Sequence, residues 1–173
     1  MTLRVQGLFK VPKTARPTTS KVREALFNIW QPWLMDAMWL DLCAGSGAMG
    51  AQALEKGARG LVAIEINPMA CKMISENLAK FSPPDRVQII KSDAIKGIKN
   101  LNHTFDLIYF DPPYESNLYL PVLTTIDKIC HPETKIGVEH STYNPLPKTI
   151  GNLVQTDSRQ YGQTALTFFA MQG

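Results

Sequence analysis

The sequence has few cysteines, which cross-link small secreted domains, and no long hydrophobic run of the kind that anchors a chain in a membrane. It has three cysteines in 173 residues, Cys43, Cys71 and Cys130, an odd number without close spacing. Neither a disulfide framework nor a zinc knuckle is therefore expected. No hydrophobic run approaches membrane-spanning length, and the N-terminus lacks the apolar core of a signal peptide. We expect a cytoplasmic protein in reducing surroundings, with no membrane segment.

The net charge is small, and the sequence has no cluster of residues that typically bind metals. The formal net charge is +3, but residues 1–30 hold six basic residues against one acid, so this segment is +5 and the remainder is −2. Such a basic segment can attract phosphate groups, or it can be an ordinary solvated arm. His103, His131 and His140 are scattered along the chain, and we predict no metal site.

The chain does contain ample material for one α/β domain, since 45% of its residues are hydrophobic. From about residue 38, short β-like runs alternate with helical patterns, which predicts a parallel sheet with helices on both faces. The strands are expected at 38–43, 61–65, 87–91, 105–110 and 135–139, and the helices at 48–57, 68–81, after Asp93, and at 118–130.

The two ends of the chain depart from this alternation. Thr18 or Thr19 can cap a helix in which Val22, Leu26 and Trp33 are among the apolar residues at helical spacing. Residues 151–171 offer two strands around a polar turn, which predicts an antiparallel hairpin at the edge. The expected fold is a single domain over 1–173, with 1–35 an arm and helix, and a mostly parallel seven-stranded sheet.

A glycine-rich loop follows the first predicted strand. Gly45, Gly47 and Gly50 match the G-x-G-x-x-G spacing, in which the backbone turns tightly, approaches a ligand closely and leads into a helix N-terminus. This pattern alone is weak evidence, because a strand-to-helix turn without a ligand can carry the same glycines.

Acids at the ends of predicted strands strengthen the case for a nucleoside cofactor. Glu65 can accept both ribose hydroxyls, and Asp93, beside the amide of Ala94, can accept an adenine amino group. A nicotinamide dinucleotide shares these features and stays an alternative. Asp41, four residues before the first glycine, suits the ammonium of a methionine moiety better than a pyrophosphate, which favours S-adenosylmethionine.

The fourth predicted strand ends in an unusually stiff segment, Asp111-Pro112-Pro113-Tyr114. Each proline restricts its own backbone and that of the preceding residue, so the carbonyl of Pro112 and the carboxylate of Asp111 are expected at fixed positions. Two such acceptors suit the two N–H bonds of an exocyclic amine, and they stabilise the positive charge that develops on it during methyl transfer. Tyr114 can stack on the base, which must be unpaired or flipped out. A rigid corner with a surface tyrosine is the alternative.

These motifs together resemble the Rossmann-like class I methyltransferases that modify exocyclic amines. Four segments together resemble the RsmD-type bacterial 16S ribosomal RNA guanine-N2 methyltransferases: RPTTSKVREALFNIW, LDLCAGSGAMGAQALEKGA, VAIEINPMA and FDLIYFDPPY. Two further segments, GVEHS and YGQTALTFF, show a weaker similarity to the same family. The first 13 residues depart from the basic, glycine-rich start that is usual in that family. The resemblance implies a 16S rRNA substrate, in a small ribosomal subunit or an assembly intermediate.

The resemblance also assigns roles to residues. The segment Asp111 to Tyr114 is expected to hold the guanine amine. The expected cofactor-binding residues are Asp41, Ala44, Gly45, Ser46, Gly47, Glu65, Ile66, Asp93, Ala94, Thr18 and Thr19, and the expected RNA contacts are Arg16, Lys21 and Arg23.

Other functions fit the same motifs. DNA adenine-N6 and protein glutamine-N5 methyltransferases also place an acid or amide before Pro-Pro-aromatic. Only 59 residues follow Tyr114, and the sheet would use most of them, which leaves little for a DNA-recognition domain. A cofactor-binding module without catalysis and an NAD-dependent oxidoreductase are the alternatives from other classes.

Overall fold

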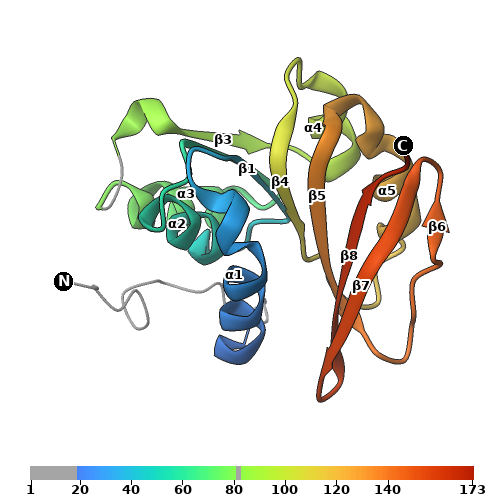
Figure 1. The fold of residues 1–173 in the computed structure, drawn as a ribbon. Coiled ribbons are helices and arrows are strands. Elements are labelled where there is room, and N and C mark those ends of the chain that lie inside the picture. The colour runs from blue at the N-terminus through green and yellow to red at the C-terminus, as the bar shows by residue number, and fades with distance from the viewer. Residues whose placement is uncertain (1–18, 81–82) are drawn as a thin grey trace.

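The computed structural model of the protein describes residues 19–80 and 83–173. The described strands form one eight-stranded sheet in the order β3-β2-β1-β4-β5-β8-β7-β6. Figure 1 shows helices against both faces of this sheet and the long β7–β8 hairpin at one side. None of the described helices is both long enough and apolar enough to cross a membrane.

The first five strands run parallel, as the alternation of apolar runs and helical patterns predicted. Nearly every residue of the central strands β1 and β4 is buried, because helices cover both faces of the sheet. The strand bounds are Met38–Leu42 (β1), Gly60–Glu65 (β2), Val87–Lys91 (β3), Phe105–Phe110 (β4) and Cys130–Ser141 (β5). These strands end together at one edge of the sheet, which we call the carboxyl edge.

Two apolar clusters hold the helices to the sheet. One cluster packs α1, α2 and α3 on one face, and the other packs α4 and α5 on the opposite face. The helix bounds are Ser20–Leu34 (α1), Ala48–Glu55 (α2), Pro68–Leu78 (α3), Ala94–Asn100 (α4) and Tyr119–Thr125 (α5), with short 3₁₀ turns at Pro84–Arg86 and Ile126–Ile129.

Helix α1 begins where the sequence indicated, but its buried face differs from the expectation. Thr19 is the N-cap, and its hydroxyl accepts from the amide of Val22 at 3.4 Å. The buried residues include Leu26 and Trp30, whereas Trp33 is 48% exposed. The prediction that Trp33 faces the core was wrong, because the helix turns this position away from the sheet and under the amine of Lys135, 4.2 Å from the ring centroid.

The antiparallel end of the sheet is larger than predicted. Strands β7 (Leu153–Tyr161) and β8 (Thr164–Met171) form the expected hairpin, and β8 pairs with β5. An eighth strand, β6 (Thr149–Ile150), pairs with the outer side of β7. Its two residues are too short a run for sequence periodicity to mark, so seven strands had been predicted.

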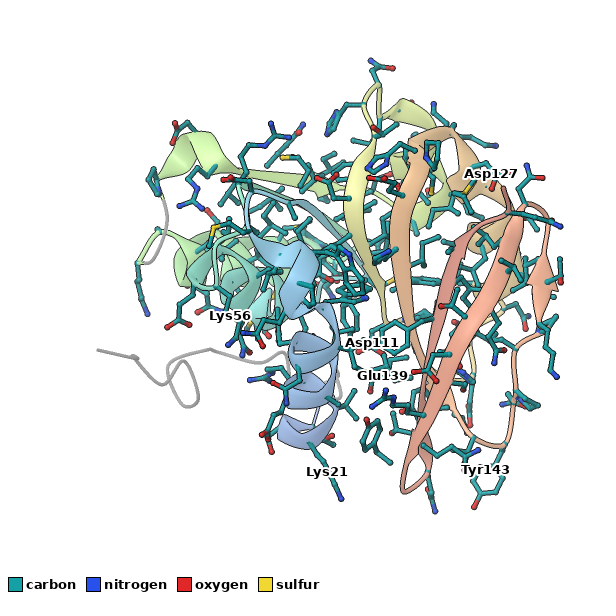
Figure 2. All side chains as sticks on the ribbon, viewed as in Figure 1. Lys21, Lys56, Asp111, Asp127, Glu139 and Tyr143 are labelled. Atoms are coloured by element: carbon teal, nitrogen blue, oxygen red, sulfur yellow. The ribbon has the colours of Figure 1, made fainter. Side chains whose placement is uncertain are left out.

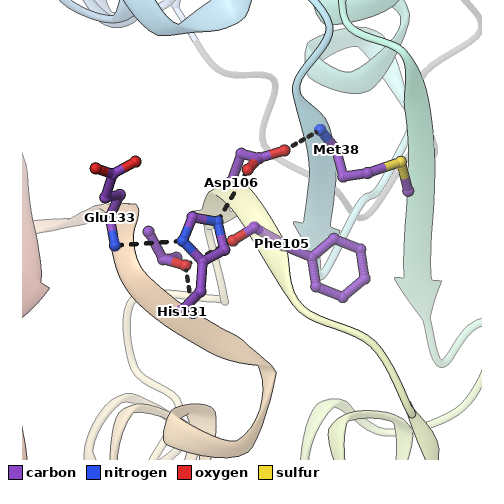
Figure 3. A network of polar contacts seen from close by, with 6 residues as sticks. Met38, Phe105, Asp106, His131 and Glu133 are labelled. Atoms are coloured by element: carbon purple, nitrogen blue, oxygen red, sulfur yellow. Dashed lines mark hydrogen bonds and ion pairs between the residues drawn. The ribbon is translucent and has the colours of Figure 1, made fainter.

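A polar network joins the amino ends of β1, β4 and β5 at the edge opposite the carboxyl edge (Figure 3). The carboxylate of Asp106 accepts from the amide of Met38 at 2.7 Å and contacts Nε2 of His131 at 2.9 Å. Nδ1 of His131 accepts from the amide of Glu133, so Nε2 carries the proton that bonds Asp106. Thr134 donates to the carbonyl of Phe105 at 2.6 Å. The network gives His131 a structural role, as the sequence suggested.

Candidate active site

The strand order reverses between β1 and β4, so a ligand crevice is expected at this point of the carboxyl edge. From β1 the chain continues to β2 and β3 on one side, while β4 and β5 lie on the other. Ligands of open α/β sheets bind at this switch point, just beyond the carboxyl ends of the strands. The loops after β1 and β4 carry the glycine motif and Asp111, so both predicted motifs border the crevice.

The glycine loop has the backbone that its sequence indicated. Gly45 and Gly47 have φ values of +59° and +78°, in the left-handed region that favours glycine. A Cβ added at Gly45 would meet no atom within 4 Å, whereas one at Gly47 would lie 3.0 Å from Cγ2 of Ile74. The first glycine therefore leaves open space on the loop, and the second allows the loop to lie against α3.

Cys43, just before these glycines, also has a positive φ, of +61°. Burial and the nearby carboxylates, Glu65 first among them, raise the pKa of its thiol to about 12. The thiol is therefore protonated at neutral pH, which excludes Cys43 as an activated nucleophile.

Glu65, at the end of β2, is bound to the glycine loop. One carboxylate oxygen accepts from the amide of Gly45 at 2.9 Å, and the other accepts from the amide of Asn67 at 3.0 Å. These bonds fix the carboxylate, and each oxygen keeps capacity for a further hydrogen bond. The orientation of Glu65 is thus fixed, and its contact with a ribose stays a prediction.

Sequence reasoning missed Asn77, which also supports the loop. Its side chain is buried on α3, and its amide nitrogen donates to the carbonyl of Ser46 at 3.1 Å. A polar residue at a position of α3 that otherwise faces the core was the available signal, since buried amides are normally hydrogen-bonded.

Asp41 lies on β1, beside this switch point. It is only 2% exposed, and its Oδ2 atom has no hydrogen-bond partner among the described residues. Burial raises the pKa of Asp41 well above its usual range, and the charges of Asp111 and Glu65 raise it further, while the amide of Gly50 lowers it. This arrangement of three carboxylates favours a bound cation, because a positive charge relieves their repulsion.

The Asp111 to Tyr114 segment leaves β4 beside β1. The amide of Asp111 contacts the carbonyl of Leu42 at 3.4 Å, which holds the segment against the end of β1. Downstream, the amide of Ser116 donates to the carbonyl of Pro113 at 2.9 Å. Among the residues that the structure describes, no main-chain amide donates to the carbonyl of Pro112. That acceptor lies outside the turn, as the two prolines predicted.

Tyr114 is attached to the antiparallel half of the sheet. Its hydroxyl lies 2.6 Å from the hydroxyl of Thr164, the first residue of β8. This hydrogen bond fixes one end of the half-buried ring while the rest of the side chain follows the stiff proline segment. The ring therefore has a defined orientation beside the crevice.

A second tyrosine of β4 forms a buried pair behind this segment. The hydroxyl of Tyr109 donates to Glu139 on β5 at 2.5 Å, and both side chains are about 1% exposed. Phe110 pairs with Val138, so Asp111 and Glu139 are the next residues along the two strands. Figure 2 shows their side chains close together at this end of the sheet. The pair joins β4 to β5 directly below Asp111.

The other predicted residues lie at the outer part of the carboxyl edge. Asp93 is exposed, and its side chain caps α4 by accepting from the amide of Lys96 at 2.8 Å. Ala94 follows as the first residue of that helix. Ile66 is 66% exposed, next to Glu65, where an apolar side chain can cover a planar ring. Asp93 therefore has a structural role, and its contact with an adenine stays a prediction.

The predicted contacts near the N-terminus are described only in part. Arg16 and Thr18 lie outside the described residues. Thr19 caps α1, Lys21 is exposed on its first turn, and Arg23, two residues later, is half-buried. Figure 2 shows Lys21 at this end of α1.

Comparison with known proteins agrees with this geometry. Residues 4–170 match the family described as Conserved hypothetical protein 95. "Putative rRNA methyltransferase YlbH" of Bacillus subtilis is 31% identical over 165 residues, which cover 92% of this chain and 90% of that protein. "Ribosomal RNA small subunit methyltransferase D" of Escherichia coli is 30% identical over 89% of this chain and 78% of its own length.

The solved structures include a similar fold at comparable identity. The structure described as "Putative methyltransferase yhhF from Escherichia coli" superposes with a TM-score of 0.84 at 30% identity, covering 95% of this chain and 91% of the other. The sequence match extends over nearly the whole chain, and the fold is shared. The chain belongs to the Conserved hypothetical protein 95 family, the RsmD family of methyltransferases.

Proposed function

We propose that this protein transfers a methyl group from S-adenosylmethionine to the exocyclic N2 amine of a guanine in 16S ribosomal RNA. The substrate is the RNA within a small ribosomal subunit or an assembly intermediate, in the cytoplasm. The observation that carries the proposal is the position of Asp111 and Pro112 beside Asp41 at the switch point, since it brings amine acceptors next to a buried carboxylate. Family membership supports the RNA substrate.

The residues present fit this cofactor. Asp41 is buried with one oxygen unpartnered in the described part of the chain, and its raised pKa reflects burial and neighbouring carboxylates. A group with an ammonium and a sulfonium supplies the missing positive charge. Asp41 would hold the ammonium, Glu65 the ribose hydroxyls, and the open space over Gly45 would receive the ligand where a side chain is absent. The chemistry that S-adenosylmethionine supplies when bound is an activated methyl group.

The chain itself positions the amine. Asp111 and the carbonyl of Pro112 accept the two N–H bonds, which draws them out of the plane of the base and makes the nitrogen lone pair available for attack. This nitrogen would be the nucleophile for the methyl group that the bound cofactor would supply, with S-adenosylhomocysteine as the leaving group. Positive charge then develops on the nitrogen, where the two acceptors stabilise it, and the amine releases its proton to solvent. Tyr114 stacks on the flipped base.

Transfer of labelled methyl groups tests the reaction and the substrate together. Purified protein is incubated with labelled S-adenosylmethionine and one of four acceptors: small ribosomal subunits from cells lacking the enzyme, naked rRNA, duplex DNA or release-factor protein. We expect label in N2-methylguanosine from 16S rRNA, with subunits preferred over naked RNA. Label only in DNA or in protein glutamine would refute the RNA assignment and favour the adenine-N6 or glutamine-N5 alternative. Binding of NADH instead of S-adenosylhomocysteine would refute the cofactor.

Replacement of Asp111 by alanine separates chemistry from cofactor binding. We expect kcat to fall by about 100-fold or more, as for the loss of a preorganised group at a charged transition state. The affinity for S-adenosylhomocysteine, measured by calorimetry, should change by less than about threefold. Asp157→Ala is the matched control, because that carboxylate is exposed on β7 and pairs with Arg159 at 3.1 Å. Equal loss of cofactor binding and activity in Asp111→Ala would show a structural role instead.

A further inference from the structure

Tyr143 is the most exposed of the large apolar and aromatic side chains in the described part of the chain, at 73%. It follows β5 in the loop before β6, at the carboxyl edge. Single exposed aromatics are common on protein surfaces, so exposure alone assigns nothing to Tyr143. Its backbone and its neighbours distinguish it.

The backbone around Tyr143 is held by hydrogen bonds on both sides. The amide of Tyr143 donates to the hydroxyl of Ser141 at 3.2 Å, and the amide of Thr142 donates to the carbonyl of Gln163 at 2.9 Å. Gln163 belongs to the tip of the β7–β8 hairpin, so the loop is attached to a second element. The ring of Tyr143 is therefore displayed to solvent from a fixed position.

His140 fixes the same loop from the inside. Its Nδ1 lies 3.0 Å from the carbonyl of Ser141 and 3.1 Å from that of Asn144, and carbonyls only accept, so Nδ1 carries the proton. Nε2 then accepts from the hydroxyl of Thr167 at 2.7 Å. Burial lowers the pKa of His140, which keeps the ring neutral in this arrangement. The two carbonyls that His140 binds lie before and after Tyr143 in the sequence, so these bonds hold the backbone of the turn that carries Tyr143.

A short path of contacts connects Tyr143 to the proposed base site. The hydroxyl of Tyr114 contacts that of Thr164, and Thr164 pairs with Ser141 across β8 and β5. Ser141 in turn accepts from the amide of Tyr143. The backbone of Tyr143 is thus linked through Ser141 and Thr164 to Tyr114, the residue that is expected to stack on the target base.

Lys21 presents an exposed amine on the opposite side of the site. Figure 2 shows Lys21 on α1 and Tyr143 at the same end of the molecule, with Asp111 between their elements. An exposed amine suits a phosphate, and an exposed ring suits the face of a base. The two side chains on either side of Asp111 therefore favour a single-stranded nucleic acid over an apolar peptide.

We propose that Tyr143 stacks on an unpaired nucleotide that flanks the target base in the RNA substrate. This inference rests on the proposed RNA methyltransferase activity. When a base leaves its stack to reach Asp111, its neighbour in the strand loses a stacking partner. A tyrosine ring with a fixed backbone replaces that partner and holds the distorted strand in place. Tyr143 is a substrate-positioning residue in this role, and it takes no part in the transfer.

The test compares Tyr143→Ala and Tyr143→Phe with Trp33→Ala. Trp33 is the matched control, because it is an exposed aromatic on the last turn of α1, away from the carboxyl edge. We expect Tyr143→Ala to raise KM for small subunits by about 5- to 150-fold, the range that corresponds to the loss of one base–aromatic stack. kcat at saturation and the affinity for S-adenosylhomocysteine should stay within about twofold of wild type. The thermal midpoint should stay within a few degrees of the wild-type value. Tyr143→Phe and Trp33→Ala should keep the wild-type KM.

The outcomes separate this inference from the function on which it rests. If wild-type protein methylates RNA and Tyr143→Ala has an unchanged KM, the stacking role is refuted and the activity stands. If Tyr143→Phe loses as much as Tyr143→Ala, the hydroxyl is what matters and stacking is refuted. If wild-type protein methylates only DNA or protein, both inferences are overturned.

Discussion

Asp41→Asn isolates the electrostatic cost of burying a carboxylate beside Asp111 and Glu65. Asp41 is almost fully buried, and burial is the main reason why its pKa lies well above the usual range; the carboxylate of Asp111 is the next. Asparagine has the same shape and carries no charge. Its carbonyl can still accept from the amide of Gly50, which in wild type favours the charged form of the aspartate. The substitution therefore removes a repelled charge and keeps the packing of β1.

The sign of the effect follows from the raised pKa. Folded protein binds the Asp41 proton more tightly than unfolded protein does, so ionisation of this group lowers stability. The loss begins near the unfolded pKa of about 3.9 and grows until the pH passes the folded pKa, with a slope of at most about 1.4 kcal/mol per pH unit. Asp41→Asn removes this loss. At neutral pH the cofactor-free variant should therefore be more stable than wild type, and the difference should grow as the pH rises.

Urea denaturation of cofactor-free protein between pH 5 and pH 8 measures this difference. Asp93→Asn is the control, because Asp93 is exposed and asparagine caps a helix about as well as aspartate. Calorimetry with S-adenosylhomocysteine should show weaker binding to Asp41→Asn, so the variant gains stability and loses ligand affinity. A variant less stable than wild type at pH 7 would refute the reasoning, since Asp41 would then be stabilising the fold as an anion.

Two further predictions concern the glycine loop and the buried tyrosine. Gly47→Ala should lower stability by about 1–2 kcal/mol or more, because it combines left-handed strain with a 3.0 Å contact to Ile74. Gly45→Ala has the same strain but no clash, and should mainly lower the affinity for S-adenosylhomocysteine in calorimetry; unchanged affinity would contradict a ligand over this loop. Tyr109→Phe deprives the buried Glu139 carboxylate of a donor and should cost about 1–3 kcal/mol in urea denaturation, whereas an unchanged midpoint would mean that Glu139 gains an equivalent donor.

The sheet and the ends of its strands could be predicted from sequence because they depend on local patterns. Apolar runs that end at Asp41, Glu65 and Asp111 mark buried strands and their carboxyl ends, and parallel pairing then brings these acids to one edge. The left-handed turn at Gly45 follows from the residue type in the same way.

Contacts between distant segments could not be predicted. The bond between Tyr114 and Thr164 spans 50 residues and depends on the register of β8 against β5. The exposure of Trp33 depends on which face of α1 meets the sheet, and a helix with apolar residues on several faces leaves that choice to packing. Asn77 supports the glycine loop only because α3 crosses beside it.

The order of strands also has a consequence for synthesis. Strand β8, residues 164–171, lies inside the sheet between β5 and β7, although it is made last among the strands. Until those residues leave the ribosome, β5 and β7 both present unpaired edges, and Tyr114 lacks its partner Thr164. Folding of the parallel half can begin during translation, but closing of the sheet must wait. The proposed base site would thus be complete only after β8 has joined the sheet.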